Sequence, residues 1–142
     1  MLFRSTEGVE RGPLLLVPGN EEAIEAARGT FAGAWVLLTG TKTPRWDSED
    51  DNYRAKLGRF LDQEGIFGTV RIARNELVIT GGRYRVDWNE LPTRTAVRVP
   101  RDEGRQLSQW LEQGVAVEIE FELDYRFIEG PIPQYKVIGG IP

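Results

Sequence analysis

The most regular pattern in the chain is a strict alternation of apolar and polar residues toward its C-terminal end. Apolar side chains occupy every second position over 115–127, and Glu118, Glu120 and Glu122 lie between them. Because successive side chains of a β-strand point to opposite faces, the alternation predicts one long strand with a buried face and a wet, acidic face. Regularly spaced acids on such a face are typical of a solvated surface rather than of a catalytic carboxylate pair.

Continuous apolar runs predict strands that are covered on both sides. Positions 14–17 form one such run, and Trp35–Leu38 forms another, which makes the second a candidate for the central strand of a sheet. Shorter β-type patterns bounded by Gly, Pro and Asn predict further strands at 66–73, 77–80, 83–87, 96–99 and 135–141.

Two helices are predicted in the first half of the chain. Asn20 is placed to cap a short helix of about two turns, and Gly29 suits a left-handed stop after it. Ser48 and Asp51 have the spacing of a capping box before a second helix, which Gly65 ends. The apolar face of this second helix consists of Tyr53, Leu57, Phe60 and Leu61.

A third helix is predicted to begin at Pro100 and to end before Gly114, with Leu107, Trp110 and Leu111 on its apolar face. The order of elements predicts an α+β fold. We expect a mixed sheet, or two sheets in a two-layer or barrel-like arrangement, with about three helices on one side. A regular doubly wound fold is not favoured.

Composition limits the possible classes of protein. A chain of 142 residues that is 40% hydrophobic and 28% charged suits one compact domain. The net charge of −4 argues against nucleic acid as a partner, since that affinity comes mostly from clustered Lys and Arg. No apolar run is long enough for a membrane span, and the N-terminal residues lack the features of a signal peptide, so the chain as given is expected to be soluble.

The chain has no histidine and no cysteine. Ser-His-Asp and Cys-His mechanisms are therefore excluded, and so are His or Cys ligands for zinc. Carboxylate, Tyr, Lys or Arg chemistry remains available. The inventory favours a binding or interaction module, with no catalytic residue, metal or cofactor of its own.

Positions 47–52 form the densest acidic cluster, and Asp47, Glu49 and Asp51 have the spacing of the first ligands of a calcium loop. The pattern then fails, because Asn52 and Gly58 stand where an EF-hand needs Gly and Glu. Capping of the following helix is the favoured interpretation.

Cations lie beside aromatic residues at two places. Arg45 precedes Trp46 in a predicted loop, and the stretch from Arg83 to Trp88 mixes arginines with Tyr and Trp. Such combinations suit contact with a peptide or a nucleotide. They also suit packing over the edge of a core, and both interpretations stay open here.

Several segments occur together in an order typical of one family. They are FAGAWVLL at 31–38, EGIFGTV at 64–70, LP at 91–92, VRVPRDEGRQL at 97–107 and LEQGVAV at 111–117. In this order and spacing they resemble the protease-associated (PA) domain over about 9–142. The resemblance implies a swivelling β/β/α fold.

The segment YKVIGGIP at 135–142 resembles the strand by which a PA insertion passes into the catalytic domain of zinc aminopeptidases and related carboxypeptidases. It departs from the family with Lys136 where Asn is usual and with Gly139 and Gly140 where Ala and Glu are common. The resemblance implies one PA-type domain over 1–142, excised from a larger peptidase that is secreted, periplasmic or membrane-anchored. Zinc and the catalytic Glu would belong to the absent domain.

By resemblance, the domain would cover the active-site cleft, restrict access of substrates, or bind partners. Its partners would be the catalytic peptidase domain of the same parent chain and peptide or protein substrates. Side chains on loops carried by a rigid sheet commonly make such contacts. The candidate binding residues are therefore Arg45, Trp46 and Trp88.

Two alternatives remain. One is an interaction or sorting PA module from an adaptor or from a subtilisin-like protease. The other is a small carboxylate-based enzyme, which predicts a concave pocket with converging acids.

Overall fold

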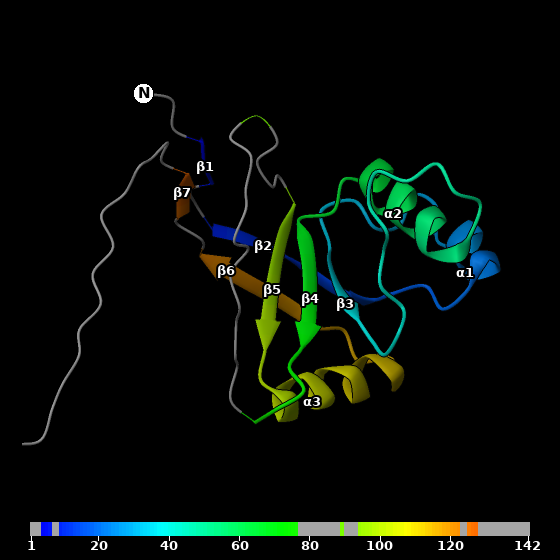
Figure 1. Ribbon diagram of the computed structural model, residues 1–142. Helices are drawn as coiled ribbons and strands as arrows, with labels where there is room; N and C mark the ends of the chain where they lie inside the picture. Colours follow the sequence, from blue (N-terminus) through cyan, green and yellow to red (C-terminus); the bar gives the residue numbers. More distant parts are fainter. Residues whose placement is uncertain (1–3, 7–8, 77–88, 90–93, 123–124, 128–142) are drawn as a thin grey trace, which may run out of the picture.

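Five strands form a mixed sheet at the centre of the structure, and three helices pack against it (Figure 1). The computed structural model describes residues 4–6, 9–76, 89, 94–122 and 125–127. The elements are β1 (Arg4–Thr6), β2 (Val9–Leu16), α1 (Glu21–Ala26), β3 (Trp35–Leu38), α2 (Tyr53–Glu64), β4 (Gly68–Ile72), β5 (Thr95–Val99), α3 (Arg101–Glu112), β6 (Glu118–Glu122) and β7 (Tyr125–Phe127).

The sheet has the strand order β5-β4-β3-β2-β6 and curls into a half-barrel. Strands β2, β3, β4 and β5 run parallel, and β6 joins the β2 edge in antiparallel orientation. The expected α+β class with a mixed sheet is confirmed. The prediction of a central strand at Trp35–Leu38 is also confirmed, because β3 lies in the middle of the order and all four of its side chains are buried.

The two faces of β3 support separate hydrophobic clusters. On one face, Val36 and Leu38 pack with residues of α1 and α2, among them Ile24, Leu57, Phe60 and Leu61. On the other face, Trp35 and Leu37 pack with Leu14, Val70, Phe121 and the α3 residues Leu107 and Leu111. Helices therefore cover both faces, and the expectation of helices on one side is wrong for α3. Right-handed crossovers through α1 and α2 put these two helices on the same face.

Short local signals start and stop the helices. The Asn20 side chain accepts a hydrogen bond from the Ala23 amide at 2.7 Å, as predicted for the cap of α1. The capping box predicted for α2 is wrong: the cap is Asn52, whose Oδ1 accepts from the Ala55 amide at 2.9 Å. Gly65 ends α2 in the left-handed conformation, as expected.

The long strand predicted at 115–127 is only partly correct. Strand β6 begins at Glu118 and pairs with β2, whereas β7 pairs with β1 in a separate two-stranded ribbon. The two ladders share one register, since Val9 pairs with Glu122 and Thr6 pairs with Tyr125. The acidic face is confirmed within β6, where the three glutamates are exposed.

Helix α3 approaches the sheet most closely at Gly104, which is buried. A Cβ atom built there would lie 2.6 Å from Cγ1 of Ile72 and 2.7 Å from its Cγ2. Leu107 and Leu111 face the core as predicted, but Trp110 is 42% exposed and does not share their environment. The absence of a Cβ at Gly104 thus lets α3 lie directly on β4.

The strands predicted at 77–80, 83–87 and 135–141 lie outside the described residues. Among the helices that the structure does describe, none is both long and apolar enough to cross a membrane.

We expect Gly104→Ala to lower the free energy of unfolding by about 1–3 kcal/mol, because the added methyl group must displace the branched side chain of Ile72. Urea denaturation would measure the change. At an unobstructed helix position the same substitution stabilises by roughly 0.5–1 kcal/mol, so a gain in stability would contradict the close approach. Gln106→Ala, at an exposed position of the same helix, is the control and should change little.

Candidate functional site

The structure places two of the three predicted site residues on the loop between β3 and α2. The Arg45 side chain is exposed and lies 3.1 Å from a carboxylate oxygen of Asp50. Trp46 is half-buried and packs against the hydrophobic cluster formed by α1, α2 and one face of β3. Trp88 lies outside the described residues. Trp46 therefore covers the core, while Arg45 is the side chain presented to solvent.

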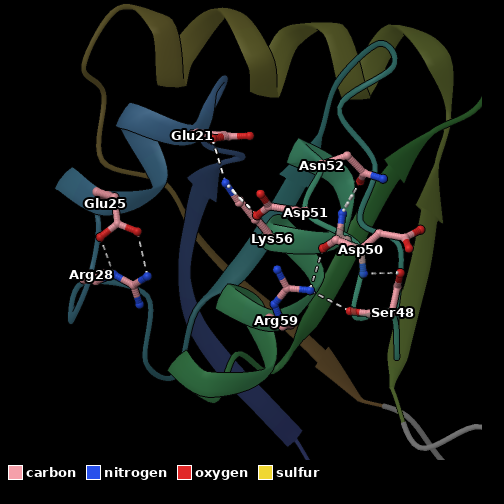
Figure 2. A network of polar contacts seen from close by, with 10 residues as sticks. Glu21, Glu25, Arg28, Ser48, Asp50, Asp51, Asn52, Lys56 and Arg59 are labelled. Carbon is pink, nitrogen blue, oxygen red and sulfur yellow. Dashed lines mark hydrogen bonds and ion pairs between the residues drawn. The ribbon is translucent and has the colours of Figure 1, made fainter.

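This loop is held tightly against α2. A Cβ at Gly58 would lie 2.3 Å from the carbonyl oxygen of Arg45, so only glycine allows the helix to pass so close. The Arg45 amide donates to the Arg54 carbonyl at 2.8 Å. Figure 2 shows Arg59 donating to the carbonyls of Ser48 and Asp50, at 2.6 and 3.0 Å. The backbone of the loop is thus fixed by its contacts with the helix.

Arg94 completes a cluster that we call the Trp46 cluster, made of Trp46, Asp47, Asp62 and Arg94. Its guanidinium donates to both carboxylate oxygens of Asp62, at 2.9 and 2.8 Å. It also donates to both oxygens of Asp47, at 3.1 and 2.8 Å, and its Cζ lies 4.6 Å from the centre of the Trp46 ring. Two forked ion pairs and a cation–π contact therefore converge on one side chain.

The charged groups of the Trp46 cluster stabilise one another in their ionised forms. The hydrogen bonds that Arg94 donates to Asp62, and then those to Asp47, raise the pKa of its guanidinium. The same contact holds the pKa of the Asp47 carboxyl below its ordinary value. Asp47 also adopts a left-handed backbone, with φ 54°, which Asp tolerates better than most residues. Its side chain and its backbone are both fixed.

A small cavity of about 250 Å³ adjoins the Trp46 cluster, at the amino ends of β4 and β5. Trp46, Asp62 and Arg94 form part of its wall, together with the backbone of Gly68. The donors of Arg94, the one cation in the described lining of this cavity, are already directed at two carboxylates. The cluster is built to hold the loop in place.

Three of the four acids in the stretch 47–52 form ion pairs within the protein. Asp47 pairs with Arg94, Asp50 with Arg45 and Asp51 with Lys56. Lys56 also contacts Glu21 of α1 at 2.9 Å, as Figure 2 shows. No group of three or more metal-binding side chains occurs in the part of the chain that the structure describes.

A second and larger cavity, of about 750 Å³, lies at the opposite end of the parallel strands. We call it the arginine cleft, because Arg71, Arg74, Arg98 and Arg105 all line it. The other polar groups on its wall are hydroxyl and amide side chains, including Thr39, Thr43, Asn75, Ser108 and Gln109. No carboxylate belongs to the described lining.

The sheet and α3 together assemble this cleft. Arg71 and Arg98 are register partners on the neighbouring strands β4 and β5, so their side chains leave the same face of the sheet. Arg105 comes from α3, which packs on the other face. The cleft therefore wraps around the edge where the parallel strands end, which is where ligands commonly bind in open sheets of this kind.

Sequence reasoning missed the arginine cleft. The four arginines are spread over positions 71 to 105, and the net charge of −4 conceals their convergence. One local signal was present: the strands GTVRI and TAVRV each carry an arginine at the next-to-last position. If the two strands are parallel and adjacent, this pattern puts both cations at one edge.

No known protein family, curated protein or solved structure matches the chain.

We expect Arg94→Lys to lower the free energy of unfolding by about 1 kcal/mol, because lysine keeps the charge but cannot donate in forked pairs to two carboxylates. Thermal or urea denaturation would measure the loss. Arg28→Lys is the control: Arg28 forms an exposed pair with Glu25, one turn away on α1, and should tolerate the exchange. Equal effects at the two positions would contradict the structural role of the Trp46 cluster.

The contact between Asp47 and Arg94 should also depend on pH. The folded pKa of Asp47 lies below its unfolded value, so the pair stabilises the fold fully above the unfolded value of about 3.9 and loses this contribution as pH falls further. We therefore expect wild type to be more stable than Asp47→Asn at neutral pH, with the difference shrinking below about pH 4. Urea titrations over this range would test it, and a difference independent of pH would contradict the charge-based account.

Proposed function

We propose that the chain is a non-catalytic accessory domain of the protease-associated type, belonging to a larger extracytoplasmic zinc-dependent aminopeptidase. The proposal rests on the sequence resemblance, and one structural observation supports it. The ribbon formed by β1 and β7 brings the segment before β2 and the segment after β6 side by side (Figure 1). Adjacent connections of this kind allow a domain to be inserted into another with little disturbance of either.

In this proposal the chemistry belongs to the parent peptidase, which would supply zinc and its ligands. The role of this domain would be to restrict access of substrates or to bind peptides and proteins. Arg45 suits that role, because it is exposed on a loop that α2 and the Trp46 cluster hold rigid. Its neighbour Trp46 would act indirectly, by fixing the position of the loop.

The longer gene product that contains this chain tests the proposal. We expect it to hydrolyse aminoacyl chromogenic substrates in a zinc-dependent manner. Replacing 9–122 by a short Gly-Ser linker between the two ribbon strands should preserve activity on such small substrates and change the relative kcat/KM among longer peptides. A product without peptidase activity, or with selectivity unchanged by the replacement, would contradict the proposal.

A single substitution gives a finer test in the same protein. Arg45→Ala should change kcat/KM for longer peptides by roughly two- to fivefold, a range that matches the loss of one exposed charged contact. Small chromogenic substrates should be unaffected. Arg28→Ala removes an exposed arginine from the turn that follows α1 and serves as the control.

The carboxylate-enzyme alternative gains no specific support from the geometry. It predicts a concave pocket with converging acids, whereas the arginine cleft has no carboxylate in its described lining. The interaction or sorting module remains the alternative if the longer product carries no peptidase domain.

A further inference from the structure

The arginine cleft has the size and lining of a binding site. Its volume of about 750 Å³ falls within the range of about 300–1,000 Å³ that is typical of pockets for small ligands. Its wall carries four arginines and several hydrogen-bond donors, but no carboxylate within the described lining. A site of this composition suits a ligand that supplies negative charge and acceptor oxygens.

Three of the four arginines of the cleft are not paired with a described carboxylate. Arg71, Arg74 and Arg105 form no ion pair with any of the described residues. By contrast, Arg11, Arg28, Arg45, Arg94 and Arg101 each contact a carboxylate. Several arginines elsewhere on the described surface are thus paired with acids, whereas Arg71, Arg74 and Arg105 in the cleft are paired with no described acid.

The cleft also brings like charges close together. Arg71 and Arg98 are register partners on adjacent strands, where like charges repel each other, and Arg98 has a further contact of its own. Arg105 adds a third positive charge from the other side of the sheet edge. A bound anion with several charged groups would offset this repulsion, because one guanidinium can grip a phosphate or carboxylate through two hydrogen bonds.

We infer that the arginine cleft binds a small oligoanion, a compact molecule with two or more phosphate or carboxylate groups. The cleft is confined to one end of the sheet, in a chain with a net charge of −4, which favours a compact ligand over an extended polyanion such as nucleic acid. The inference does not depend on the proposed function, since it concerns binding by this chain alone.

Isothermal titration of the 142-residue chain at low ionic strength tests the inference, with inorganic pyrophosphate and citrate as separate probes. We expect saturable binding of at least one probe, with a dissociation constant of roughly 0.1 mM. Thermal denaturation should show a rise in Tm with saturating probe, of about 4 °C. Binding of pyrophosphate alone assigns the site to phosphates, and stronger binding of citrate assigns it to carboxylates.

Matched variants separate the cleft from general charge screening. Arg105→Gln and Arg74→Gln should each raise the dissociation constant about tenfold, as expected for the loss of one charge-assisted contact. Arg28→Gln makes the same change in charge outside the cleft and should alter it less than twofold. Arg71→Gln should also weaken binding, because it removes a cation from the wall of the cleft.

Three results would overturn the inference. The first is the absence of saturable binding for both probes. The second is an equal loss of binding in Arg28→Gln and Arg105→Gln, which would show that the anions respond only to net charge. The third is binding of an acidic peptide such as oligoglutamate with no binding of either small anion, since a protein segment would then be the ligand.

Discussion

Complete burial of the four side chains of β3 is the constraint on which the rest of the structure depends. Trp35 and Leu37 must be shielded from water on one face of the sheet, and Val36 and Leu38 must be shielded on the other. A strand with two apolar faces must lie inside a sheet and between two layers of helices. The positions of α1 and α2 on one face and of α3 on the other follow from this requirement, and so does the placement of β2 and β4 on either side.

Arginine has different roles at the two ends of the parallel strands. At the amino ends, Arg94 is surrounded by two carboxylates and an indole ring, and it serves to hold a loop. At the carboxyl ends, Arg71 and Arg105 line an open cleft with no described carboxylate on its wall. An arginine whose hydrogen bonds are made within the protein is structural, whereas arginines gathered without acids create a local positive potential that the net charge of the chain does not reveal.

Much of the fold could be predicted because its signals are local. The apolar run at Trp35–Leu38, the cap at Asn20 and the stop at Gly65 each depend on neighbouring residues, and each appears in the structure. The cap of α2 was misplaced because Ser48 and Asn52 are both good capping residues, and only the path of the loop decides between them. The position of α3 depends on its close approach to Ile72, which periodicity does not reveal.

The candidate sites were the least predictable part. The Trp46 cluster needs Arg94, far along the chain, and the arginine cleft needs the parallel register of β4 and β5.

The ribbon of β1 and β7 has a mechanical consequence. Its outer residues, Arg4 and Phe127, are paired with each other, so any force that separates the connections beyond them acts across the ladder at one end. In that geometry the hydrogen bonds break one pair at a time, like a zipper, rather than all together as in shear. The ribbon would yield first and at low force, while β2 and β6 would continue the same register behind it. Separation of these two connections would thus be absorbed before it reached the buried strand β3.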